Sequence, residues 1–480
     1  MPSVPGTESA YDRLPHAHGL VWKPARGASR APEAGDSHTG MEGRIRIYPD
    51  TSGTVTTGLG DRTMVRRAWW VVLTLAMVLA AQWMMARGHA DLAVNEELLA
   101  GNPTLHVSAE EEYRGTVIVL HGFGGSKEMM QYWGYALARL GFDVYIPDLP
   151  GHGAQTAPMA DSPGTANQVR DALVAAGRAE PDRVGLIGHP TSLNPLAPLY
   201  DLDAVADAAR RLSSDVGGDV PAGAAPGGSP AWLLLGLAGG VGALPAVAAL
   251  VRPDPRRSGR RQQPAGLVTG LAAVAVSLLS AVLAVVYLRV PQLGVATLDY
   301  LLPYFLVAAV VLLLLRKLWP REFGASAPGE AESVPHSLLR GLAVALAFLG
   351  ALVPVIHQNV TYFVPTGPRI LPLAATALAY WLYAFQEESL KRAVAGGPSP
   401  AGLVLGLAAK ILMVATWVGA GVLPNPPAHL PAVLPVALGV LVTLEILSGV
   451  LAAMRLSALS VALAEAVAVG WTAAVMLPLL

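Results

Sequence analysis

The chain contains no cysteine among its 480 residues. Disulfide bonds, thiolate nucleophiles and cysteine-bound metal ions are therefore excluded. Charged residues are also scarce, at 14% of the chain against about 25% in soluble domains. The 33 basic and 34 acidic residues give a net charge of −1, so the charge balance does not indicate a nucleic-acid partner.

Several short motifs are absent as well. The sequence has no GxGxxG or Walker-type phosphate-binding loop, no HExxH metal motif and no run of heptads. Nucleotide-driven transport and zinc-protease chemistry thus have no motif to support them. We expect neither a metal nor a cofactor.

Long apolar runs are what the chain has in abundance. Apolar residues make up 53% of it and the mean hydropathy is +0.47, which excludes one large soluble globule. The first run, 68–86, follows Arg66 and Arg67 and is long enough for an uncleaved transmembrane anchor. Residues 1–60 are rich in Pro, Gly, Ser and Thr and are predicted to be disordered. Met64 is a second candidate for the start of translation.

Further apolar runs fill the C-terminal half and predict a multi-pass membrane domain at 231–480, with about eight helices. The runs lie near 231–251, 265–288, 297–315, 338–356, 370–385, 401–423, 431–453 and 457–479. Basic residues follow alternate runs, as in the 252–264 loop and at Lys391 and Arg392. The positive-inside rule puts these loops in the cytoplasm, and Arg289 and Arg369 are its two exceptions.

This orientation places residues 88–212 on the outer side of a cell membrane, with the lipid bilayer as the first partner of the chain.

In residues 88–212 strands alternate with helices, which predicts an α/β fold with a partial doubly wound parallel sheet. The strands are expected at 104–107, 116–120, 143–146 and 184–187, and the helices at 126–140, 164–176 and 202–212. The composition of residues 213–230 predicts a flexible linker.

Three turns follow predicted strands of this α/β segment. The first glycine turn reads HGFGGS at 121–126, the second reads DLPGHG at 148–153, and the third turn reads GHPTS at 188–192. Glycines allow backbone amides to approach a ligand closely. Ligands of such sheets bind at the carboxyl ends of the strands, where all three turns lie, so this edge is the candidate site.

In these turns the sequence resembles the α/β-hydrolase family, serine-hydrolase branch. HGFGGS resembles its oxyanion turn and DLPGHG its D-x-x-G-H-G turn, and the resemblance covers about residues 104–212. It implies hydrolysis of a small ester, thioester or peptide by a serine, without a cofactor. It also implies an oxyanion site at Gly122 and Phe123, completed by the backbone amide of Thr191.

The third turn departs from the family pattern. The nucleophile elbow should read G-x-S-x-G, but Pro190 occupies the nucleophile position and supplies no hydroxyl group. The segment from His189 onward also resembles the end of such a domain, where a histidine base precedes the last helix. A missing middle section would explain both features, whether by natural deletion or by sequence error. His189 and Ser192 are then the candidate base and displaced nucleophile of a truncated domain with impaired catalysis.

The glycine turns carry two more histidines. His121 and His152 belong to the first and second glycine turns, and both are predicted to be structural rather than catalytic.

The membrane domain contains a second candidate site. Its Glu387-Glu388 pair, followed by Arg392, has the E-E-x-x-x-R spacing that resembles the first motif of CPBP-type intramembrane proteases. The same spacing suits an ordinary ion pair between Glu388 and Arg392 at a solvated helix end. The runs that follow contain no histidine that could complete a metal or water-activating site.

Three further charged residues fall within predicted spans. They are Lys410, Glu445 and Glu465. A Lys410–Glu445 pair would cancel two of these charges and hold helices together.

The sequence thus leads to three functional hypotheses. The first is a membrane-embedded protein with an extracytoplasmic hydrolase-like domain whose serine chemistry is impaired. The second is a non-catalytic binding or structural membrane protein. The third is an intramembrane protease-like enzyme that uses Glu387 and Glu388.

Overall fold

The computed structural model describes most of the chain from residue 57 to residue 480. The residues outside the description are 1–56, 110–112, 161, 189–206, 209, 213–229, 251–265, 288–293, 321–332, 396–398 and 422–429. The predicted disordered segment 1–60, the linker 213–230 and the helix 202–212 therefore lie wholly or largely outside the described residues.

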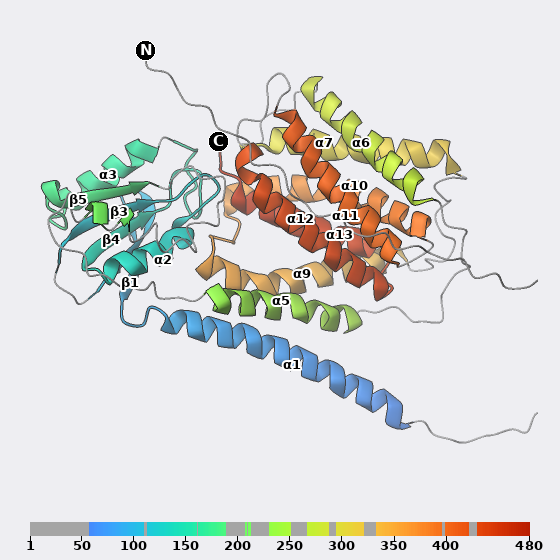
Figure 1. Ribbon diagram of the computed structural model, residues 1–480, viewed down its shortest axis with the longest axis horizontal. Helices are drawn as coiled ribbons and strands as arrows, with labels where there is room; N and C mark the ends of the chain where they lie inside the picture. Colours follow the sequence, from blue (N-terminus) through green and yellow to red (C-terminus); the bar gives the residue numbers. More distant parts are fainter. Residues whose placement is uncertain are drawn as a thin grey trace, which may run out of the picture. The chain divides into compact units, whose positions relative to one another are not determined.

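The α/β segment is built on a five-stranded mixed sheet of order β1-β2-β4-β3-β5 (Figure 1). The strands are β1 (Ala93–Leu99), β2 (Asn102–Ser108), β3 (Gly115–Leu120), β4 (Phe142–Pro147) and β5 (Val184–Gly188). β3 pairs in parallel with β4 and β5, as the sequence predicts. β1 and β2 pair antiparallel, and β2 also pairs antiparallel with β4, so the sheet is mixed. The acidic β1 sequence AVNEELL has no clean apolar alternation, which is why it is missing from the prediction.

Helices cover both faces of the sheet. Successive side chains of each strand point to opposite faces, so both faces present apolar residues for a helix to pack against. Val117 and Val119 of β3 pack in one core with Trp133 of α2 (Lys127–Ala138). Ile118 and Leu120 point to the other face and pack with the apolar side of α3 (Ser162–Ala175). The strand-to-helix connections after β3 and β4 contain the two glycine turns, so both turns lie at one edge of the sheet.

The rest of the described chain is helical. Its long helices, with the N-terminal α1, are α1 (Thr57–Arg87), α5 (Pro230–Leu250), α6 (Leu267–Tyr287), α7 (Leu298–Leu318), α9 (Val334–Asn359), α10 (Ile370–Ala395), α11 (Pro400–Ala420), α12 (Leu430–Ala453) and α13 (Ala458–Met476). Within the described residues, seven helices are long and apolar enough to cross a membrane, α1 among them. The predicted runs at 231–251 and 370–385 form α5 and α10, which are not among the seven. α10 contains the charges from Glu387 to Arg392.

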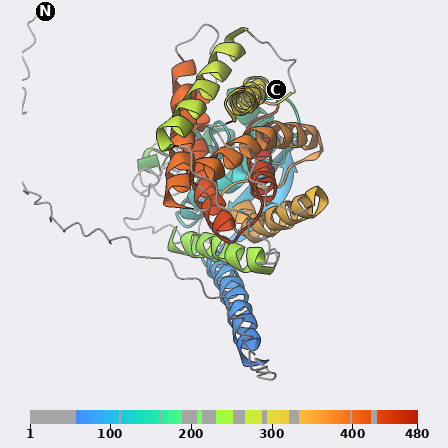
Figure 2. The same ribbon diagram turned by 90° about the vertical axis from the view of Figure 1, so that its right-hand side faces the viewer.

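The ends of several helices meet the α/β segment. The chain leaves α1 at Arg87 and enters β1 six residues later, and α1 packs against α5, as Figures 1 and 2 show. Residues that follow α9 and α13 and residues that precede α10 form hydrogen bonds with the α/β segment. Lys391 and Arg392, by contrast, lie near the far end of α10, away from the end that begins beside Arg369. Lys391 and Arg392 thus lie at the end of this helix opposite the α/β segment.

Candidate functional site

His121 ties the first glycine turn to the second. Its ring Nδ1 lies 2.9 Å from the carbonyl oxygen of Gly122, and its Nε2 accepts a hydrogen bond of 3.0 Å from the backbone N–H of Leu149. The side chain is buried, and its ring centroid lies 5.2 Å from that of His152. Both ring nitrogens of His121 are thus engaged by the backbone, which supports the prediction of a structural role.

Asp148 is the buried anchor of the second glycine turn. Its Oδ1 accepts a hydrogen bond of 2.8 Å from the backbone N–H of Lys127, the first residue of α2. Its Oδ2 accepts one of 2.9 Å from the backbone N–H of Ala154. Burial raises the pKa of the Asp148 carboxyl, and the charge and hydrogen bonds of Lys127 act against this rise. Asp148 therefore holds the turn against the start of α2.

Lys127 and Glu128 complete a buried charge cluster with Asp148, which we call the junction cluster. Lys127 Nζ lies 2.7 Å from Glu128 Oε1 and 3.4 Å from Asp148 Oδ2. Burial alone would lower the pKa of Lys127, but the carboxylates of Asp148 and Glu128 raise it above its ordinary value. Burial raises the pKa of Glu128, together with the nearby charge of Asp148. Buried charges of this kind are costly unless they are paired, and here both carboxylates contact the ammonium group of Lys127.

Ser126, the last residue of the first glycine turn, joins this cluster to the helices. Its hydroxyl donates to Glu128 Oε2 over 2.6 Å and accepts from the backbone N–H of Tyr362 over 2.8 Å. It also lies 3.2 Å from the hydroxyl of Thr361, just after α9. The Tyr362 ring in turn lies 5.3 Å from Lys127 Nζ. Ser126 is therefore a buried contact residue with no exposed hydroxyl.

Arg369 makes a second connection between the α/β segment and the helices. It is 1% exposed, and its guanidinium donates to the carbonyl oxygens of Gly151 (2.8 Å), Ala474 (2.5 Å) and Leu477 (2.6 Å). One side chain thus joins the second glycine turn to the end of α13. The charge of Arg369, an exception to the predicted positive-inside pattern, lies buried among carbonyl groups.

The C-terminal residues of the chain lie directly against the second glycine turn. Leu479 donates its backbone N–H to Gly151 O, and its own carbonyl accepts from Met159, each over 2.9 Å. Gly151 has φ +80°, and a Cβ placed there would lie 2.6 Å from Leu479 O. Only glycine fits this close approach of two backbones. In the first turn, Gly124 similarly faces the carbonyl of Met476.

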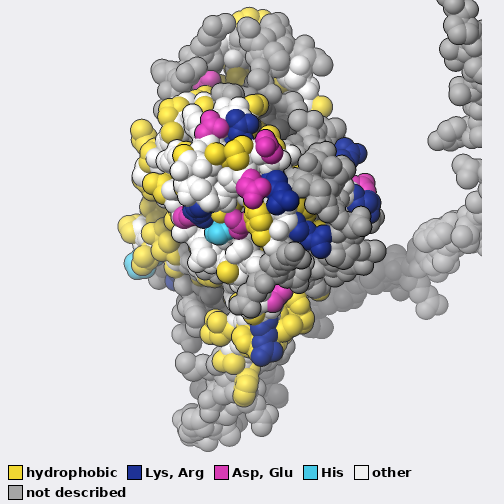
Figure 3. Space-filling model, turned by 90° about the vertical axis from the view of Figure 1, so that its left-hand side faces the viewer, with side chains coloured by type: hydrophobic (Ala, Val, Ile, Leu, Met, Phe, Trp, Pro, Cys, Tyr) yellow, Lys and Arg dark blue, Asp and Glu magenta, His cyan; other side chains and the backbone are white. Residues whose placement is uncertain are grey.

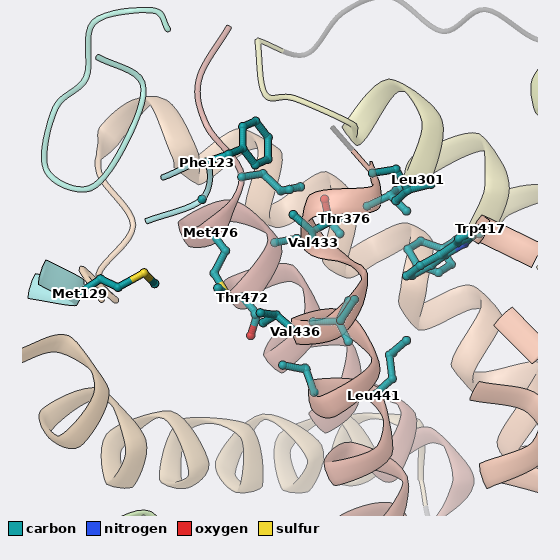
Figure 4. A pocket seen from close by; sticks show the side chains of 18 residues that line it. Phe123, Met129, Leu301, Thr376, Trp417, Val433, Val436, Leu441, Thr472 and Met476 are labelled. Carbon is teal, nitrogen blue, oxygen red and sulfur yellow. The ribbon is translucent and has the colours of Figure 1, made fainter. Parts of the chain in front are cut away.

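An apolar cavity of about 100 Å³ opens where the first glycine turn meets the helices (Figure 4). Phe123, Gly124 and Met129 line it from the α/β segment. The helical side is lined mainly by apolar side chains of α7, α12 and α13, with Trp417 of α11 and the hydroxyls of Thr376 and Thr472. Such a lining suits the hydrocarbon part of a ligand. The predicted oxyanion residue Phe123 therefore borders a space that can hold an apolar group.

The face of the α/β segment seen in Figure 3 has mixed charge. Basic and acidic side chains lie next to each other on it, as Figure 3 shows. Arg178 pairs with Glu97 and Arg139 pairs with Asp91. No patch of a single charge stands out on this face of the described residues.

A second charge cluster lies inside the helical region, and we call it the helix cluster. Its members are Glu387, Glu388, Lys391 and Arg392 of α10, Lys410 of α11, Glu445 of α12 and Glu465 of α13. All except Arg392 are at most 6% exposed. The predicted solvated helix end is therefore wrong for Glu387 and Glu388, because α11, α12 and α13 cover them and bring charged partners.

The predicted Lys410–Glu445 contact exists at 3.7 Å, but Lys410 Nζ lies closer to Glu387 Oε2, at 2.5 Å. The predicted Glu388–Arg392 pair also forms, at 2.9 Å. Lys391 adds contacts of 2.7 Å to both Glu388 and Glu445. Sequence spacing found the pairs along one helix, whereas the pairs between helices depend on packing.

The other predicted site residues divide into two groups. Gly122 and Phe123 lie in the first glycine turn, next to the apolar cavity. His189, Thr191 and Ser192 lie outside the described residues, so the structure does not test whether they approach that turn. Sequence reasoning missed Ser126, Lys127 and Asp148 as a buried cluster and Arg369 as a connecting residue. The exceptional position of Arg369 in the charge pattern was the one signal that could have found it.

Known proteins resemble part of this chain. The family model for the alpha/beta hydrolase fold matches residues 115–189. The chain is similar to the epoxide hydrolase VrEH1 from Vigna radiata, with 23% identity, 22% of this chain and 32% of that chain covered, and a TM-score of 0.17. It is also similar to a VrEH2 mutant crystallised as a complex, with 20% identity, 26% and 36% covered, and a TM-score of 0.17.

This chain thus spans about a third of the length of these two structures. No curated protein matches it. The family match confirms an α/β-hydrolase-like segment, joined here to several candidate membrane helices. The resemblance of the E-E-x-x-x-R segment to intramembrane proteases finds no support in these comparisons.

Proposed function

We propose that this chain is a multi-pass membrane protein whose α/β-hydrolase-like segment binds an amphipathic acyl ligand without hydrolysing it. The apolar end of the ligand occupies the cavity between the first glycine turn and the helices, and its carbonyl group lies toward Phe123. The observation that carries the proposal is the apolar lining of this cavity, which combines Phe123, Gly124 and Met129 with residues of the helices.

The loss of hydrolysis is supported by the sequence of the third turn. Pro190 occupies the nucleophile position and cannot attack a carbonyl. The hydroxyl of Ser126 is buried and hydrogen-bonded to Glu128 and Tyr362, so it does not replace the missing nucleophile. Backbone amides in a glycine turn can still polarise a carbonyl, which is a binding role.

Serine-dependent hydrolysis of an ester, thioester or peptide is the second candidate function. Its support is the family match over residues 115–189 together with a cavity that borders the predicted oxyanion turn. In this alternative His189 is the base, Ser192 is the nucleophile, and Thr191 supplies the second oxyanion amide.

An intramembrane protease that uses Glu387, Glu388 and Arg392 has less support. Glu388 is engaged by Lys391, Arg392 and Ser448, and Glu387 is bound by Lys410. Carboxylates held in ion pairs are poor bases for the activation of water.

Photo-crosslinking tests the binding site. A short-chain acyl ester with a diazirine at the end of its chain is added to the full-length protein in lipid nanodiscs, and the crosslinked peptides are mapped. We expect labels on α12 and around the first glycine turn. Val436→Trp fills the cavity and abolishes them, whereas Leu438→Trp, at an exposed position of the same helix, retains them. Equal labelling of both variants would overturn the proposed site.

The proposal also includes the orientation of the chain. The α/β segment lies outside the cytoplasm, because the basic residues of the chain gather after alternate helices. Protease added to intact cells or spheroplasts should cleave within 213–230 and spare 252–264. Cleavage of 252–264 with 213–230 intact would reverse the orientation.

A further inference from the structure

The helix cluster has more acidic than basic groups. Four carboxylates, from Glu387, Glu388, Glu445 and Glu465, face three cations, from Lys391, Arg392 and Lys410. With every group charged, the cluster would carry a net charge of −1. Lys410 is 0% exposed, so this charge would be buried. An uncompensated buried charge is more costly than a bound proton.

The pairing within the cluster identifies the carboxylate that lacks a close cation. Glu388 lies within 2.9 Å of both Lys391 and Arg392, Glu445 lies 2.7 Å from Lys391, and Glu387 lies 2.5 Å from Lys410. Among the described residues, the cation paired with Glu465 is Lys410, at 3.9 Å, which is beyond hydrogen-bond distance.

The hydrogen bonds of the cluster give an independent observation. Glu465 is 3% exposed, and its Oε1 has no hydrogen-bond partner among the described residues. Glu387 Oε1 and Glu445 Oε2 also lack one. Buried carboxylate oxygens without partners are rare in folded proteins and call for a bound ligand or proton.

We infer that the helix cluster is a proton-binding site and that its proton resides on Glu465. The inference is independent of the proposed acyl-ligand site, which is lined by the first half of α12, whereas Glu445 lies in its second half. A protonated Glu465 makes the cluster neutral and turns one of its oxygens into a hydrogen-bond donor.

A polar cavity of about 40 Å³ provides a route for the proton. It is lined by Glu388, Lys391, Arg392, Glu445 and Ser448, and by residues around the start of α11. This volume has room for one or a few water molecules. Glu445 lines the cavity and shares Lys410 with Glu465, so it links the cavity to the proposed proton position.

The charge state of Glu465 depends on the groups that face it from the neighbouring helices. α10 contributes Glu387, Glu388, Lys391, Arg392 and the rings of Tyr380 and Tyr383, which lie 5.6 Å from Lys410 Nζ. α11 contributes Lys410 and α12 contributes Glu445. α9 also packs against α13, and its titratable residues lie in its first two turns (His336, Arg340) and in its last turn (His357).

Infrared difference spectroscopy on the full-length protein in nanodiscs tests this site. The C=O stretching band of a protonated carboxyl is measured at neutral pH, and the spectrum of Glu465→Gln is subtracted from that of the wild type. We expect a band equivalent to one protonated carboxyl in the difference spectrum. The matched control is Glu96→Gln, whose side chain is 70% exposed on β1, and it should give no such band.

A second variant tests the charge count. Lys410→Met removes one cation, so we expect it to increase the protonated-carboxyl signal by about one group relative to the wild type. A difference spectrum of Glu465→Gln without a protonated-carboxyl band would overturn the inference. If Glu465→Gln fails to fold, the comparison of Lys410→Met with the wild type decides alone. An unchanged protonated-carboxyl signal in Lys410→Met would also overturn the inference.

Discussion

The chain buries two clusters of lysine and acidic side chains, and their hydrogen bonds differ. In the junction cluster, both carboxylate oxygens of Asp148 and both of Glu128 accept hydrogen bonds. In the helix cluster, three carboxylates each have an oxygen without a hydrogen bond among the described residues. The same residue types thus serve two purposes. A fully satisfied cluster fixes two parts of the protein together, whereas a partly satisfied cluster can take up a proton.

The largest effect is expected at the junction cluster. Asp148→Ala removes a carboxylate that is 0% exposed and leaves Lys127 with fewer partners. We expect a loss of about 3–5 kcal/mol in the free energy of unfolding. Thermal unfolding of the full-length protein measures it.

Arg170→Ala is the control, because Arg170 pairs with Asp171 on the surface of the α/β segment. Arg170→Ala should lower the free energy of unfolding by less than about 1 kcal/mol. Equal costs for Asp148→Ala and Arg170→Ala would mean that the junction cluster does not stabilise the fold.

A steric change at the same contact should have the next largest effect. Gly151→Ala imposes a strained φ and brings a Cβ within 2.6 Å of Leu479 O. Gly177→Ala imposes a similar strain, at φ +67°, but meets no atom within 4 Å. We expect Gly177→Ala to lower the free energy of unfolding by about 1–2 kcal/mol and Gly151→Ala to lower it by more.

Hydrogen exchange distinguishes the two glycine variants. Only Gly151→Ala should speed the exchange of residues 149–159, which contact the C-terminal residues. Equal exchange in both would show that the second glycine turn and Leu479 are not packed together.

A pH effect follows from Lys127. Its pKa in the folded protein is raised above 10.5, so its stabilising contribution is fully present below that pH. As the pH rises further, toward the folded pKa, the contribution is lost. We expect the stability difference between wild type and Lys127→Met to shrink only above about pH 10.5. Unfolding measured on both proteins from neutral to alkaline pH checks this, and a difference that already shrinks near pH 8 would contradict it.

The smallest effect is expected at Glu465. Glutamine resembles a protonated glutamate, so Glu465→Gln should change the stability by less than about 1 kcal/mol if the proton resides there. Glu388→Gln should cost more, because Lys391 and Arg392 then lose a paired charge. Thermal unfolding at neutral pH ranks the two variants, and the reverse ranking would place the proton on Glu388.

Much of the fold follows from local patterns in the sequence. The strands β2 to β5 lie within two residues of the predicted bounds at each end, because short runs with apolar and β-branched residues are a strong signal and glycine turns follow β3 and β4. β1 was not predicted, since it is held by its pairing with β2 and its sequence has no clean alternation of apolar and polar residues. The candidate membrane helices follow from apolar length alone, but α10 shows that a helix of this region can also carry charges that packing brings into ion pairs.

The candidate sites were less predictable for a physical reason. The glycine turns are contiguous in sequence, so their motifs could be found directly. The contacts of Arg369 with Gly151, and of Lys410 with Glu387, join residues far apart in the chain. No spacing rule encodes such contacts, since they depend on how the helices pack.

The most direct test of the account concerns the chemistry of the hydrolase-like segment. Full-length protein is treated with a fluorophosphonate, which labels only an activated serine, and is assayed with short p-nitrophenyl esters. We predict no covalent label and negligible turnover, and no rescue by Pro190→Ser, because Ser192 still stands where the elbow needs glycine. Stoichiometric labelling that disappears in Ser192→Ala would contradict the account and identify Ser192 as the nucleophile of a working hydrolase.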